Sequence, residues 1–140
     1  MSRNIAICID KSAFRAIDGF NSVDINNLGN IINYSVGALV IDHLNIIDDD
    51  DIPMLWQEIS SKMAVGGQIV MRFIDAKVLA QKFVDNIIGD KEFMNYISIL
   101  KSVLTVDKIY NQIGSDFIVT DTDRSEIYTT IKVLRNSISW

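Results

Sequence analysis

Residues 36–73 constrain the fold more than any other part of the chain. They read VGALVIDHLNIIDDDDIPMLWQEISSKMAVGGQIVMRF. The continuous apolar run at residues 37–41 is typical of a strand buried on both faces, as in a parallel sheet. A second apolar run, at residues 68–73, predicts another strand of the same kind. We therefore expect these two strands to be parallel neighbours inside one sheet.

A helix is predicted between the two strands. Pro53 suits the first turn of a helix, where its missing N–H leaves no hydrogen bond unmade. Apolar residues recur every fourth position at Leu55, Ile59 and Met63, which gives one apolar stripe. Glycine accepts the left-handed backbone that often ends a helix, so Gly66 and Gly67 are interpreted as the helix stop. Strand, helix and strand in this order form a right-handed βαβ unit.

The remaining elements extend this unit into an α/β fold. Apolar runs predict strands at residues 5–9 and 19–25, and a short edge strand at 30–34. Three helices are expected after Phe73, with Asp75, Asp90 and Thr105 as N-caps and Gly89 and Gly114 as stops. The chain then has strands at 117–119 and 126–134, joined by a polar turn as an antiparallel pair. We predict one domain over residues 1–140, with a Rossmann-like, mostly parallel sheet.

Composition narrows the class of protein. Hydrophobic residues make up 49% of the 140 residues and charged residues 22%, which is typical of a globular domain. The net charge of −5 argues against general nucleic-acid binding, which needs a basic face. No apolar run is long enough to cross a bilayer, and no signal peptide is evident, so no membrane partner is expected. The single cysteine, Cys8, fits a reducing compartment, and we expect a cytoplasmic protein.

Acidic residues follow three of the predicted strands. Asp10 ends the first, Asp24 the second, and Asp42 with His43 the strand at 37–41. Ligands of open α/β sheets bind beyond the carboxyl ends of the strands, so these side chains are the candidate site. Alternatively Asp24 only caps a turn, and His43, the one histidine, is a satisfied surface or partly buried residue. With one histidine and no CxxC pair, no protein metal site is expected.

The run of aspartates at residues 48–51 has two interpretations. Its position before the predicted helix favours a solvated loop whose charge complements the helix dipole. A cation clamp is the minor alternative, because four adjacent carboxylates on a loop cannot all face one ion.

Three segments resemble class I S-adenosylmethionine-dependent methyltransferases. Residues 19–25, GFNSVDI, resemble the family's second strand, which ends in an acidic residue. Residues 35–44, SVGALVIDHL, resemble its fourth strand. Residues 54–70, MLWQEISSKMAVGGQIV, resemble the family's helix, double glycine and strand. The resemblance continues into the helix, Gly114 and closing strands, and so covers most of the chain.

The resemblance implies roles for the acidic residues. Asp24 stands where the family's acidic residue accepts hydrogen bonds from the ribose hydroxyls of S-adenosylmethionine, a role that suits a carboxylate. Asp10 falls at the first strand end, beside the cofactor's methionine part. Asp42 and His43 fall at the strand end that faces the methyl group and the acceptor, where a histidine serves as general base.

The chain departs from the family at the first strand end. The family has a glycine pattern there, which lets the backbone approach the cofactor, whereas this chain has Cys8, Ile9 and Asp10. The family's Leu-Glu-His after the fourth strand is replaced by Asn45, Ile46 and Ile47. The usual helix and extra strand before residue 36 are missing.

Two functions follow as hypotheses. The first is a methyltransferase-like pseudoenzyme with weak or lost S-adenosylmethionine binding, which acts as an interaction or structural protein. The second is an active methyltransferase of unknown acceptor that needs a partner to complete its site. Either hypothesis implies a protein partner or a homo-oligomer. Small versions of the family carried by tailed phages also resemble this chain, which implies a viral source.

Overall fold

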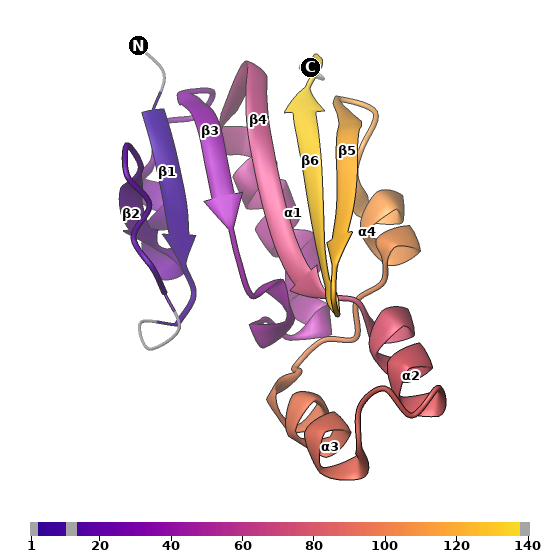
Figure 1. Ribbon diagram of the computed structural model, residues 1–140. Helices are drawn as coiled ribbons and strands as arrows, with labels where there is room; N and C mark the ends of the chain where they lie inside the picture. Colours follow the sequence, from indigo (N-terminus) through magenta and orange to yellow (C-terminus); the bar gives the residue numbers. More distant parts are fainter. Residues whose placement is uncertain (1–2, 11–13, 138–140) are drawn as a thin grey trace.

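The protein is built on one six-stranded sheet with the order β2-β1-β3-β4-β6-β5. The computed structural model describes residues 3–10 and 14–137. β1, β2, β3 and β4 are parallel, β6 runs antiparallel to β4, and β5 runs antiparallel to β6 (Figure 1). The strands are β1 (Arg3–Cys8), β2 (Asn21–Asp24), β3 (Val36–Ile41), β4 (Met63–Ile74), β5 (Phe117–Ser125) and β6 (Tyr128–Arg135). The predicted α/β class, the adjacent inner strands β1, β3 and β4, and the antiparallel final pair are confirmed.

One face of this sheet carries the main hydrophobic core. Alternate residues of the inner strands point to it because side chains of a strand alternate between faces. α1 (Ile52–Lys62), α4 (Val106–Gln112) and the 3-10 helix η1 (Ile25–Asn30) pack on this face. In Figure 1, α1 lies behind the sheet and α4 stands beside β5. The core residues of the sheet include Ile5, Ile7, Leu39, Ile41, Ile69, Met71, Ile131 and Val133, each at most 3% exposed.

The opposite face of the sheet has no helix over its centre among the described residues (Figure 1). α2 (Ala76–Val84) and α3 (Asp90–Ile99) lie beyond the end of β4 instead. The connection from β1 to β2 moves towards one edge of the sheet, whereas the connection from β3 to β4, which contains α1, moves towards the other edge. Because both connections are expected to be right-handed, they lie on opposite faces, and the β1–β2 connection therefore lies on this face. Its described part, residues 14–20, contains no helix. A parallel sheet normally has both faces covered, so this face is unusually open.

The double glycine does not stop a helix, and this prediction is wrong. α1 ends at Lys62, and β4 begins at Met63. Val36 pairs with Met63, but Ala38 pairs with Gln68, so β4 bulges between these pairs. Gly66 has a φ of 82°, and a Cβ at Gly67 would meet the carbonyl oxygens of Ala64 and Val36 at 2.8 Å. Both glycines serve this bulge.

Three further boundaries differ from the predictions. The edge strand predicted at residues 30–34 is wrong, because η1 ends at Asn30 and no strand follows before β3. α3 has Gly89 as its N-cap and begins at Asp90, and α2 already ends at Val84. The predicted turn at residues 120–125 is wrong, because β5 continues to Ser125, which pairs with Tyr128. Backbone pairing with β6 compensates for the polar sequence of this strand.

Two predicted helix caps are confirmed. The Asp75 carboxylate accepts hydrogen bonds from the backbone N–H groups of Lys77 and Val78 at the start of α2. The Thr105 hydroxyl accepts one from the N–H of Lys108 at the start of α4. Such bonds satisfy N–H groups that have no partner inside the helix.

Candidate functional site

A cleft opens at the carboxyl ends of β1 and β3, on the sheet face that no helix of the described residues covers. Its volume is about 830 Å³, within the range of ligand pockets. Three of the predicted site residues line it: Asp10, Asp42 and His43. Asp24 is not among its lining residues. The topology therefore brings together the first and third of the three strand ends.

Asp42 is the centre of a polar cluster in this cleft. It directly follows β3, and its Oδ1 accepts hydrogen bonds from the backbone N–H of His43 at 2.7 Å and from Arg72 Nε at 2.8 Å. Its Oδ2 lies 3.6 Å from His43 Nε2. His43 has left-handed backbone angles, φ 56° and ψ 43°, which non-glycine residues adopt uncommonly. This turn directs the His43 ring back towards Asp42.

Arg72 and Tyr128 complete the cluster, and the sequence analysis missed both. Arg72 lies on β4, and its guanidinium carbon stands 4.4 Å from the centroid of the Tyr128 ring on β6. About 41% of the Arg72 side chain is exposed, and both residues line the cleft. A lone arginine in the otherwise apolar run of residues 69–74 was the available signal. Its proximity to Tyr128 depends on the register between β4 and β6.

Asp24 is the last residue of β2 and the N-cap of η1. Its Oδ1 accepts the backbone N–H of Asn26 at 2.9 Å. The alternative that it caps a turn is confirmed, while its predicted ribose contact stays a prediction. Asp10 is exposed and lies at the end of β1.

Comparison with solved structures identifies the fold. An S-adenosylmethionine-dependent methyltransferase from Mesorhizobium loti is 12% identical with a TM-score of 0.62, and the match covers 96% of this chain and 81% of that one. The plantazolicin methyltransferase BpumL, solved with S-adenosylhomocysteine, is 11% identical with a TM-score of 0.62, over 96% and 67%. The chain has the class I methyltransferase fold.

The methyltransferase-like domain also resembles a larger structure. A possible exported protein from Bordetella parapertussis is 17% identical with a TM-score of 0.57, and the match covers 85% of this chain but only 45% of that one. The chain matches no protein-family model and no curated protein sequence. Over residues 3–10 and 14–137, no helix is long and apolar enough to cross a membrane.

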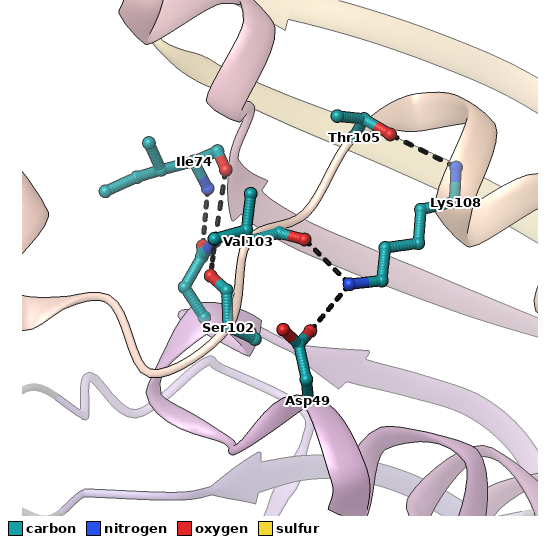
Figure 2. Close-up of polar contacts among 7 residues, drawn as sticks. Asp49, Ile74, Ser102, Val103, Thr105 and Lys108 are labelled. Atoms are coloured by element: carbon teal, nitrogen blue, oxygen red, sulfur yellow. Dashed lines mark hydrogen bonds and ion pairs between the residues drawn. The ribbon is translucent and has the colours of Figure 1, made fainter.

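Asn45 is a buried polar residue in the turn after His43, and it is only 3% exposed. Its side chain accepts the N–H of Ile74 at 2.7 Å and donates to the carbonyl oxygens of Ile74 and Ser102 at 3.1 and 3.3 Å. Ile74 and Ser102 are labelled in Figure 2. Asn45 therefore ties the turn after His43 to the end of β4. The role of Asn45 in this domain is structural.

The acidic run at residues 48–51 contacts α4 through an ion pair between Asp49 and Lys108. Residues 48–51 are all exposed and lie directly before α1, as expected for a solvated loop. Lys108 Nζ donates to Asp49 Oδ1 at 2.7 Å and to the Val103 carbonyl oxygen at 2.9 Å (Figure 2). In the described part of the chain, no three His, Cys, Asp or Glu side chains are placed to hold a metal ion.

Proposed function

We propose that this methyltransferase-like domain binds S-adenosylmethionine weakly or not at all in isolation and acts as an interaction or structural protein. The observation that carries the proposal is the end of β1. Cys8 is buried there and pairs with Asp24 across the sheet, and Ile9 packs partly against the core. The chain has no glycine at this strand end.

These residues do not fit the methionine part of the cofactor. Its carboxylate needs backbone N–H groups at close range, and side chains at Cys8 and Ile9 hold the backbone away. Asp10 adds a like charge. A buried charged group left without partners costs about 1–3 kcal/mol or more. A combined loss of about 4 kcal/mol would weaken the affinity roughly a thousandfold.

Contacts to the ribose of S-adenosylmethionine would recover little of this lost affinity. Asp24 already uses one carboxylate oxygen to cap η1 and lies outside the lining of the cleft. A single hydroxyl contact from its other oxygen is worth about 1.5–3 kcal/mol at best. It would not offset the defects at the end of β1.

Exposed apolar side chains on α3 support the interaction role. Met94, Ile97 and Ile99 are 60%, 43% and 59% exposed, and no residue of this helix is buried. Ile87, in the turn before α3, is 64% exposed. A helix that exposes several apolar side chains and buries none of its residues suits contact with another protein.

Calorimetric titration of the purified protein with S-adenosylmethionine tests the proposal. We expect no heat of binding or a dissociation constant near the millimolar range. Asp24→Ala and, as a matched control at an exposed carboxylate, Asp18→Ala should both behave like the unsubstituted protein. A low micromolar dissociation constant that is abolished by Asp24→Ala but kept by Asp18→Ala would overturn the proposal.

The alternative function is a methyltransferase completed by a partner. The placement of Asp42 and His43 together in the cleft favours it, because a histidine beside a carboxylate is an arrangement suited to a general base. This alternative predicts that a partner protein restores binding of S-adenosylmethionine. Binding that stays absent with every partner argues for the structural role.

A further inference from the structure

We propose that the cleft binds a small molecule with an oxyanionic group on an apolar body, and that Arg72 is the anchor for the anion. The inference concerns the helix-free sheet face and does not depend on S-adenosylmethionine binding. It goes beyond the proposed interaction role.

The floor of the cleft is a flat apolar row. Ala6, Val40 and Val70 come from β1, β3 and β4 and are paired in register across the sheet. Phe14 and Ile17 of the β1–β2 connection also line the cleft. Ala6 is only 1% exposed, so part of this sheet face is already shielded. The remaining space suits the body of a small ligand better than a docked helix, which needs a broad exposed strip.

Arg72 is held in place before any ligand arrives. Asp42 fixes its Nε, and the Tyr128 ring lies against its guanidinium. Neither of its terminal Nη groups donates a hydrogen bond to a residue in the described ranges. A guanidinium held in this way has already lost part of its side-chain freedom. Asp42 occupies its Nε, so the edge formed by the two Nη groups is the one that matches a carboxylate or a related oxyanion.

The charged residues that line the cleft bear on how an anion would bind at Arg72. Among the described lining residues, Asp10 and Asp42 contribute two negative charges and Arg15 and Arg72 two positive ones. The charges of these lining residues balance, so the negative charge of Asp10 near the end of β1 is offset within the cleft. The ion pair offsets the charges of Asp42 and Arg72 alike. Asp42 and Tyr128 hold Arg72 in position, whereas Arg15 is exposed, so we assign the anion to the Nη groups of Arg72.

Two matched dyes test the inference by fluorescence titration. The first is 8-anilinonaphthalene-1-sulfonate, an oxyanion on an apolar body, and the second is its uncharged analogue N-phenyl-1-naphthylamine. We expect saturable binding of the anionic dye to one site, at least tenfold tighter than the neutral dye. Arg72→Gln should remove most of this preference. Lys132→Gln, a cation on the same sheet face but outside the lining of the cleft, should keep it.

A second variant separates the site from general surface binding. Val40→Trp fills the floor while Arg72 stays in place, and it should weaken both dyes at least tenfold. Circular dichroism and thermal unfolding check that each variant is folded. Equal affinity for the two dyes, or an unchanged preference in folded Arg72→Gln, would overturn the proposal. Neither dye resembles S-adenosylmethionine, so the dye titration and the calorimetric titration test separate proposals. Failure of one proposal does not imply failure of the other.

Discussion

At the scale of single residues, buried polar side chains fasten the ends of strands. Arg135 is 5% exposed and lies at the end of β6. It donates hydrogen bonds to the carbonyl oxygens of Ser60 and Met63, where α1 passes into β4, and its Nη2 faces Asp116 at 3.8 Å. Asn45 likewise bonds backbone groups at the other end of β4, namely the N–H and the carbonyl oxygen of Ile74. Each side chain satisfies several backbone groups at once, so its loss leaves more than one buried group unpaired.

Asn45→Ala should therefore destabilise the protein strongly. The variant leaves the N–H and carbonyl of Ile74 without these partners, and each buried polar group left unsatisfied costs about 1–3 kcal/mol. We expect the free energy of unfolding in urea to fall by at least about 2 kcal/mol. Asn95→Ala, at an exposed position of α3, is the matched control and should change it by less than about 0.5 kcal/mol. Similar losses for the two variants would show that the Asn45 bonds contribute little.

At the scale of elements, the bulge in β4 connects α1 to the sheet. The strand begins beside Val36, bulges through residues 64–67, and re-joins β3 at Gln68. This path lets Met63 stay in the core at 0% exposure while the helix ends one residue earlier. Gly67 is placed where two carbonyl oxygens come close, so the bulge depends on the absence of a side chain there.

Gly67→Ala is the direct test of this bulge. A methyl group 2.8 Å from two backbone oxygens forces the strand to shift, and overpacking of this kind costs about 1–3 kcal/mol. Gly114→Ala is the control, because nothing lies within 4 Å of a Cβ at that position. We expect chemical denaturation to show a clear loss for the first variant and a change within about 0.5 kcal/mol for the second. Equal stability of both variants would contradict the assigned bulge.

Local patterns account for the elements that were predicted correctly. Continuous apolar runs identified β1, β3 and β4 because these strands are buried on the core side and partly covered on the other. Asp75 and Thr105 were predictable as caps because capping involves only neighbouring residues. Met63 was assigned to the helix because it fits both the helical spacing and a buried strand position, and only pairing with Val36 decides between them.

The site was predictable only in part. Asp10, Asp42 and His43 line the cleft because strand ends of a parallel sheet meet at one edge. Arg72 and Tyr128 were not predicted, because their contact needs the register in which Arg72 pairs with Thr130 and Ile74 with Tyr128. No local pattern in the sequence encodes that register. The open sheet face was not predicted either, because it depends on the absence of a helix from the described part of the β1–β2 connection.

At the scale of the whole molecule, two separate cores divide the protein. The main core joins the sheet to η1, α1 and α4. A small cluster of Ile74, Leu79 and Ile127 supports α2 and α3, with Phe83 and Phe93 stacked 4.2 Å apart. α3 has no buried residue, so little burial holds it to the rest of the chain. Parts of a protein with few buried contacts open locally without global unfolding.

Native-state hydrogen exchange should detect this division. We expect the backbone amides of α3 to exchange through local opening, with an opening free energy at least about 2 kcal/mol below that of β3. Leu39 and Val40 in β3 provide the reference, because β3 is paired on both sides. Equal protection of α3 and β3 would mean that the helix is part of the main cooperative unit.

The position of β6 has a consequence for synthesis on the ribosome. β6 is the last strand in the order of the chain, yet it lies between β4 and β5. While β6 is still in the exit tunnel, β5 has no strand to pair with and β4 lacks a neighbour on one side. The nascent chain can form the parallel part of the sheet early, but it exposes two unpaired edges until β6 has left the exit tunnel. Unpaired edges of this kind favour aggregation, so a pause in translation before β6 should lower the yield of folded protein.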